Sequence, residues 1–83
     1  MDSGHTRKFT VYTTALCAPC DGLKNYLSAN GIAFATRDLM MDEEAADFIE
    51  TKGIRSSPVL QIDDTLFYGA DLNKENLDRV LNL

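Results

Sequence analysis

The feature that most constrains this chain is a Cys-X-X-Cys motif at residues 17–20, placed where a strand pattern gives way to a helix pattern. Residues 8–12 read as a strand, and residues 13–16 as the loop that follows it. Apolar residues then recur at helical spacing over residues 18–30. Pro19 suits the first turn of such a helix, where a backbone N–H is not needed. The sequence therefore predicts that the first thiol lies at the start of a helix.

This position has a chemical consequence for Cys17. The first turn of a helix carries unpaired N–H groups and the positive end of the dipole, which stabilise an anion such as a thiolate. A Cys-X-X-Cys motif at a helix start lowers the pKa of its thiol, so we expect a lowered pKa for Cys17. A disulfide between Cys17 and Cys20 would close a loop of only about four residues and stabilise the fold by roughly 2 kcal/mol. We therefore expect a redox-active disulfide rather than a structural one.

Length and charge exclude several classes of function. The chain has 83 residues and a formal net charge of -5, which suits one small domain. Clustered Lys and Arg are absent, so nucleic acid is not an expected partner. Neither a signal peptide pattern nor an apolar run of about 20 residues occurs, so we expect a cytoplasmic protein without a membrane partner. Residues 1–7 are predicted to be a disordered leader and residues 8–83 a single domain.

The remaining patterns define an α/β order, β-α-β-α-β-β-α. Three further strands and two further helices are expected after the first helix, with a hairpin turn at Asp63-Asp64. The first two strands, joined through a helix, should be parallel. A four-stranded mixed sheet flanked by three helices on both faces follows. The expected strands are 8–12, 32–38, 59–62 and 65–68, and the expected helices are 18–30, about 42–52 and 74–83.

At this point the sequence resembles the thioredoxin superfamily, and its small glutaredoxin-like branch in particular. The resemblance covers residues 8–83 and includes Val11-Tyr12-Thr13, the Cys17-Ala18-Pro19-Cys20 motif, the stretch 53–59 and Gly69. It implies a thioredoxin-like (glutaredoxin) fold. It also implies a dithiol–disulfide oxidoreductase that acts as an electron carrier, with Cys17 and Cys20 as the catalytic pair.

The resemblance also implies roles for residues outside the motif. It implies a cis peptide bond before Pro58, which would turn the Ser57 backbone toward the thiols and toward an extended substrate strand. Gly69 and Asp71 lie where family members meet their thiol ligand. Tyr12 and Pro19 are expected to support the site, Tyr12 as a core or wall residue.

The sequence is compatible with two groups of proteins within this branch. The NrdH-redoxins, which donate electrons to ribonucleotide reductase and are reduced by thioredoxin reductase, match better over residues 38–59. The glutathione-dependent glutaredoxins, which would use glutathione as co-substrate, typically carry a basic residue just before the first cysteine, where this chain has Leu16. We favour the first group, with no bound cofactor and a monomeric state.

A function of another class is an iron–sulfur or metal-binding module. Zinc needs about four ligands. Cys17, Cys20 and His5 supply at most three, so no metal site is predicted.

Overall fold

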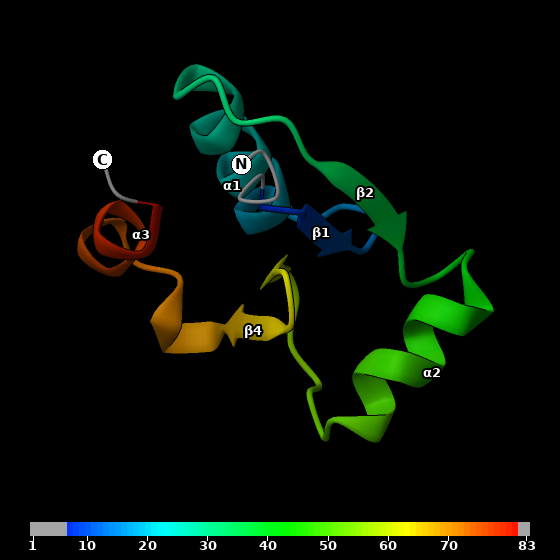
Figure 1. The fold of residues 1–83 in the computed structure, drawn as a ribbon. Coiled ribbons are helices and arrows are strands. Elements are labelled where there is room, and N and C mark those ends of the chain that lie inside the picture. Colours follow the sequence, from blue (N-terminus) through cyan, green and yellow to red (C-terminus); the bar gives the residue numbers. More distant parts are fainter. Residues whose placement is uncertain (1–6, 82–83) are drawn as a thin grey trace.

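A four-stranded mixed sheet of order β2-β1-β3-β4 forms the centre of the computed structural model, which describes residues 7–81. The observed order is the predicted β-α-β-α-β-β-α, and the architecture is the α/β, thioredoxin-like fold (Figure 1). A short 3-10 turn, Gly69–Asp71, precedes the last helix. The elements are β1 (Phe9–Thr13), α1 (Ala18–Ala29), β2 (Ala35–Asp38), α2 (Glu43–Thr51), β3 (Val59–Ile62), β4 (Thr65–Tyr68) and α3 (Lys74–Leu81).

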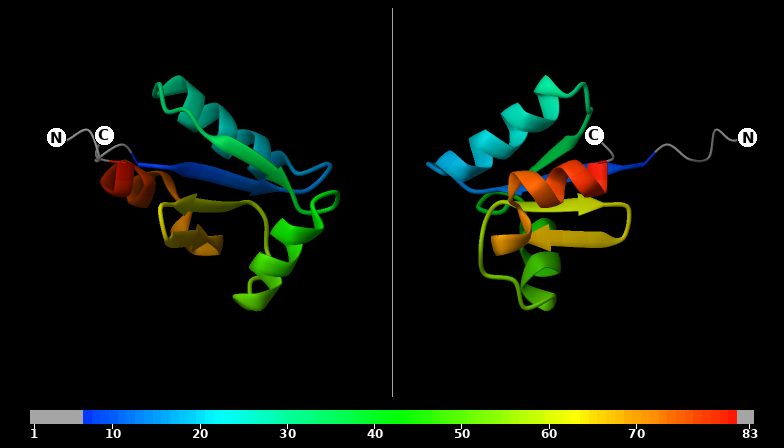
Figure 2. Two further views of the ribbon diagram at one scale, coloured as in Figure 1. Left: turned by 45° about the vertical axis from the view of Figure 1, so that its right-hand side comes forward. Right: turned by 90° about the vertical axis from the view of Figure 1, so that its left-hand side faces the viewer.

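Strand directions bring four loops to one end of the sheet. β1 and β2 are parallel, so both finish at this end. β3 is antiparallel to β1, with Tyr12 opposite Val59, so it begins there. β4 pairs antiparallel with β3, with Val59 opposite Tyr68, and finishes there. The loop after β1 carries the cysteines, and we call this end of the sheet the cysteine end (Figure 2).

Helices cover both faces of the sheet, as the sequence predicted. α1 and α3 pack on one face and α2 on the other (Figure 2). The larger core consists of Val11, Leu23, Leu27, Leu60, Ile62, Leu77 and Leu81. The smaller core, under α2, consists of Tyr12, Ala45, Ile49, Ile54 and Val59.

Strand β1 is buried on both faces. In the sequence Phe9 and Val11 alternate with polar neighbours, which is typical of a strand with one buried face. Instead Thr10 and Thr13 are also buried, and Val11 and Tyr12 belong to different cores. β1 lies between two other strands and under helices on both sides, so both of its faces are shielded from water.

Some element boundaries also differ. Thr13, predicted as loop, is the last residue of β1 because it pairs with Asp38. The strand expected over 32–38 is confined to Ala35–Asp38. The N–H of Ile32 instead bonds back to the carbonyl of Leu27, which closes the end of α1 after Gly31 at a positive φ of 72°.

The two chain ends are only partly within the described residues. Residues 1–6 of the predicted leader, and the predicted extension of the last helix through residues 82–83, lie outside them. Arg7, the last residue of the predicted leader, donates a hydrogen bond to the carbonyl of Val80. α1 is the longest helix that the structure describes, with 12 residues, and thus falls short of the roughly 20 apolar residues that a bilayer requires.

Acidic residues lie at the start of α2. Asp42 is the N-cap, and its carboxylate accepts a hydrogen bond from the N–H of Ala45. The same carboxylate accepts a hydrogen bond from Arg37 at 2.6 Å, and this bond is the main reason that the pKa of Asp42 is lowered. The pair ties the end of β2 to the start of α2.

Candidate active site

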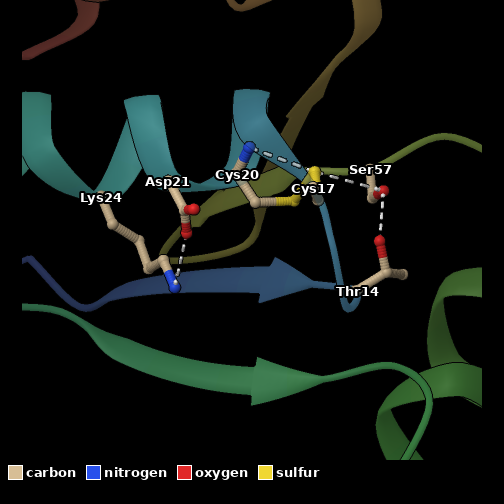
Figure 3. The surroundings of a disulfide bond; sticks show 6 residues. All are labelled: Thr14, Cys17, Cys20, Asp21, Lys24 and Ser57. Atoms are coloured by element: carbon tan, nitrogen blue, oxygen red, sulfur yellow. Dashed lines mark hydrogen bonds and ion pairs between the residues drawn. A yellow bond between two sulfur atoms is a disulfide. The ribbon is translucent and has the colours of Figure 1, made fainter.

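The first cysteine caps helix α1. β1 ends at Thr13, a short turn follows, and α1 begins at Ala18 with Cys17 as its N-cap. The sulfur of Cys17 accepts a hydrogen bond from the N–H of Cys20 at 3.1 Å (Figure 3). The predicted placement of the thiol at a helix start is confirmed, and one of the unpaired N–H groups of the first turn is directed at this sulfur.

The two sulfurs form a disulfide but differ in exposure. Cys17 and Cys20 are bonded to each other in the structure. Cys20 lies under the first turn of α1 with only 1% of its surface exposed, whereas Cys17 is only partly buried. A molecule approaching from solvent therefore reaches the sulfur of Cys17 and not that of Cys20.

The hydroxyl groups of Ser57 and Thr14 lie in a row next to the sulfur of Cys17. The Ser57 hydroxyl lies 3.9 Å from it, and 3.0 Å from the hydroxyl of Thr14 (Figure 3). The Ser57–Pro58 peptide bond is cis, as the resemblance implied. Pairing of Tyr12 with Val59 holds this loop beside the turn after β1. Residues 14 and 17 thus meet residue 57, which lies 43 and 40 positions further along the chain.

A cleft of about 400 Å³ lies next to the disulfide. Four of the predicted site residues line it: Pro19, Ser57, Pro58 and Gly69. Asp71 belongs to the same 3-10 turn as Gly69 but is not part of the lining. The cis-proline loop therefore forms one wall of this cleft.

The rest of the cleft comes from residues that the sequence did not mark as site residues. α1 contributes Leu23 and Tyr26, and α3 contributes Lys74 and Leu77. The Tyr26 hydroxyl donates to Asp78, which also accepts from Lys74 at 2.9 Å, so the two helices are joined at the rim. Only tertiary packing of α3 against α1 brings these side chains together, and no local pattern signals it.

Tyr12 lies apart from the sulfurs. It is 4% exposed in the core under α2, and its hydroxyl donates to the side-chain carbonyl of Gln61. Burial raises the pKa of Tyr12, so the phenol stays protonated at neutral pH. These contacts place Tyr12 as a core residue.

Leu16 has an unusual backbone for its residue type. Its φ is 54°, in the left-handed region, and its side chain is fully exposed directly before Cys17. A non-glycine residue in this region costs on the order of 1 kcal/mol or more, and such residues gather at functional sites. No pattern in the sequence indicated this conformation.

No metal centre is evident among residues 7–81. No group of three or more His, Cys, Asp and Glu side chains in that range is placed to hold a metal ion. His5, the third ligand considered from the sequence, lies outside the described residues.

A thioredoxin-like sheet with an exposed sulfur and a buried sulfur at one helix start defines a thiol–disulfide redox protein. The glutaredoxin family model matches residues 9–67, and the chain belongs to the glutaredoxin family.

Individual relatives agree with this assignment. A Mycobacterium tuberculosis protein named as a glutaredoxin (MT3292) is 34% identical over 77 residues, which cover 90% of this chain and 87% of that protein. The structure of NrdH-redoxin from Escherichia coli matches with a TM-score of 0.70 and 27% identity, over 75% of this chain and 82% of that one. Glutaredoxin 1 from Francisella tularensis, complexed with cacodylate, matches with a TM-score of 0.74 and 26% identity, over 94% and 100%.

Proposed function

We propose that this glutaredoxin-like protein is an NrdH-redoxin-type electron donor that reduces protein disulfides, with ribonucleotide reductase as its target and thioredoxin reductase as its reductant. The observation that carries the reaction is the unequal exposure of the two bonded sulfurs, with Cys17 accessible and Cys20 at 1%. The donor role places the protein in the cytoplasm and requires no bound cofactor. A monomer presents the site fully.

The reaction starts from the reduced pair. The Cys17 thiolate attacks one sulfur of the target disulfide, forming a mixed disulfide, and the second target sulfur leaves with the electron pair of the broken bond. The Cys20 thiolate then attacks the sulfur of Cys17. The first target sulfur leaves as a thiolate, so the target has gained two electrons and Cys17–Cys20 is again a disulfide. Thioredoxin reductase supplies two electrons to reopen it.

The surroundings of Cys17 support its role as the attacking sulfur. The N–H of Cys20 points at it, and the positive end of the α1 dipole lies beneath it. Both features favour the thiolate over the thiol, so we expect a lowered pKa for Cys17 in the reduced protein. We propose that Ser57, Pro58 and Gly69, which line the cleft, hold the target segment. Asp71, in the same 3-10 turn as Gly69, is proposed to contact the target at the edge of the cleft.

The choice of reductant follows from the residue before Cys17. Glutathione-dependent members of the family carry a basic residue there, and this chain carries an exposed Leu16. Glutathione has two carboxylates, which a leucine does not bind. The alternative, a glutathione-dependent glutaredoxin, is favoured by Arg55, which lines a second hollow of about 270 Å³ on the other side of Ser57.

A coupled assay separates the two reductants. NADPH consumption with a disulfide substrate is measured first with thioredoxin reductase alone, and then with glutathione plus glutathione reductase. We expect turnover in the first mixture and only background in the second. Turnover confined to the glutathione mixture would instead identify a glutathione-dependent glutaredoxin. An assay without the protein supplies the background rate in each mixture.

The hydroxyl of Ser57 is expected to lower the pKa of the Cys17 thiol. This hydroxyl lies 3.9 Å from the sulfur in the disulfide form, and we expect it to donate to the thiolate of the reduced protein. Replacing Ser57 by alanine should raise the pKa of the Cys17 thiol by changing its acid dissociation constant about fivefold, since one hydrogen bond contributes about 1 kcal/mol. The measurement is thiolate absorbance at 240 nm against pH, together with the rate of alkylation by iodoacetamide.

A conservative variant tests whether the hydroxyl itself is responsible. Ser57→Thr keeps a hydroxyl at the same position and should preserve the titration of Cys17. An unchanged titration in Ser57→Ala would show that the hydroxyl does not act on the sulfur.

A further inference from the structure

The exposed apolar side chains of this protein are concentrated at the cysteine end of the sheet. Within residues 7–81, the exposed large apolar side chains are Leu16, Met40, Met41 and Tyr68. Leu16 follows β1, the two methionines follow β2, and Tyr68 ends β4. The strand directions bring all four to the end that carries the disulfide. Exposed apolar side chains that gather around a reactive group indicate an interaction surface.

Three of these side chains belong to two adjoining turns. The turn after β2 is tied to the end of β1 by a hydrogen bond from the N–H of Leu39 to the carbonyl of Thr13, at 2.8 Å. Figure 2 shows the two turns next to each other beyond the ends of β1 and β2. We call Leu16, Met40 and Met41 the apolar ridge.

The backbone of the second turn is firmly held while its side chains stay in water. The N–H of Met40 donates to the carboxylate of Asp38 at 2.8 Å, and the N–H of Met41 donates to the Asp38 carbonyl at 3.1 Å. Met40 is nevertheless 67% exposed and Met41 82% exposed. Neither methionine, nor Leu16, belongs to either core. The ridge therefore lies outside both cores of the described fold and is exposed for contact with a partner.

The position of the ridge limits what its partner is. Leu16 is covalently next to Cys17, so a partner large enough to extend beyond the sulfur of Cys17 on this side contacts the ridge. Burial of exposed Leu and Met side chains is favourable, and Met adapts its shape to an uneven surface. A small hydrophilic thiol leaves most of the ridge in water, whereas a folded protein covers it.

The charge beside the ridge specifies the partner further. Between residues 37 and 44 there are four acidic residues and one arginine. Arg37 is already paired with Asp42 at 2.6 Å and lies 3.8 Å from Glu44. The ridge is therefore bordered by excess negative charge, and Glu43 and Glu44 are exposed. A partner with basic side chains at this border complements it.

We infer that the apolar ridge docks the target of Cys17, and that this target is a protein disulfide flanked by apolar side chains with basic residues on one side. This inference rests on the proposed disulfide reduction and adds the chemistry of the partner surface. The ridge selects for such targets over small thiols and over polar disulfides.

Two synthetic peptides with one internal disulfide each provide the test. In one, Leu and Lys flank the cysteines, and in the other, Ser and Glu. The wild-type protein is expected to reduce the Leu/Lys peptide with a kcat/KM about tenfold higher, mostly through KM. The triple variant Leu16→Ser, Met40→Gln, Met41→Gln should lose most of this preference. Raising the salt concentration should reduce the preference of the wild-type protein.

A control variant and a small disulfide substrate separate a failure of the ridge assignment from a failure of the proposed function. Tyr68→Ser removes an exposed apolar side chain from the opposite edge of the cysteine end and should keep the peptide preference. Equal kcat/KM for the two peptides, a preference that survives in the triple variant, or an equal loss in Tyr68→Ser would each overturn the ridge assignment. A wild-type protein unable to reduce even bis(2-hydroxyethyl) disulfide would overturn the proposed function instead.

Discussion

Replacing Cys17 with serine is expected to lower disulfide reduction to the uncatalysed rate. A serine hydroxyl is not ionised at neutral pH and cannot form the exchangeable sulfur–sulfur bond on which the reaction depends. Cys20 does not substitute for it because only 1% of its surface is exposed. The measurement is the rate of reduction of a protein disulfide such as insulin, with dithiothreitol as a common reductant.

The partner substitution, Cys20→Ser, has a different expected result. Cys17 still attacks the target, but no second sulfur releases it, so the mixed disulfide accumulates. One equivalent of target chain should be found attached to Cys17 by non-reducing mass spectrometry. Full turnover in Cys17→Ser, or attachment through Cys20 in the wild-type protein, would contradict the assigned roles.

The effect of these two substitutions on activity must be distinguished from their effect on folding stability. Either substitution removes the disulfide, which we expect to contribute about 2 kcal/mol because it closes a short loop. Unfolding of both variants should therefore be compared with that of the reduced wild-type protein. Matching unfolding curves would show that the lost activity reflects chemistry and not folding.

Replacing Leu27 with alanine is expected to lower the free energy of unfolding by about 2–5 kcal/mol. Leu27 is fully buried in the core that α1 and α3 share with the sheet. A chain of this length is expected to have a total stability of only about 4–12 kcal/mol. Urea unfolding followed by circular dichroism at 222 nm measures the change.

An exposed residue on the same helix provides the control. Ser28 follows Leu27 but faces solvent, so Ser28→Ala should change the free energy of unfolding by less than about 0.5 kcal/mol. A loss below about 1 kcal/mol in Leu27→Ala would mean that α1 does not pack on the sheet as described. A large loss in Ser28→Ala would have the same meaning.

Element order and the helix starts were predictable because they depend on local chemistry. Cys17 was predicted at a helix start, and the structure confirms it. Acidic residues at 42–44 likewise lie at the start of α2, where unpaired N–H groups favour them. Strand limits were less predictable because they depend on partners. Thr13 is a strand residue only because Asp38 lies beside it, and β2 starts late because the end of α1 folds back on itself.

The candidate site divides in the same way. The cysteine pair and the cis peptide bond before Pro58 were expected, the latter through family resemblance, and the structure contains both. The link from Thr14 to Ser57 and the α3 wall of the cleft were not expected. Both depend on residues more than 40 positions apart, and periodicity within a single element carries no information about them.

The burial of Cys20 also bears on how the protein meets its targets. The second sulfur is tethered within bonding distance of the first, which gives it an effective concentration of at least millimolar and no need to diffuse. Cys20 therefore attacks each mixed disulfide soon after it forms and releases the target. Complexes with the wild-type protein should be too short-lived to survive chromatography, and rapid quenching with acid would be needed to capture them.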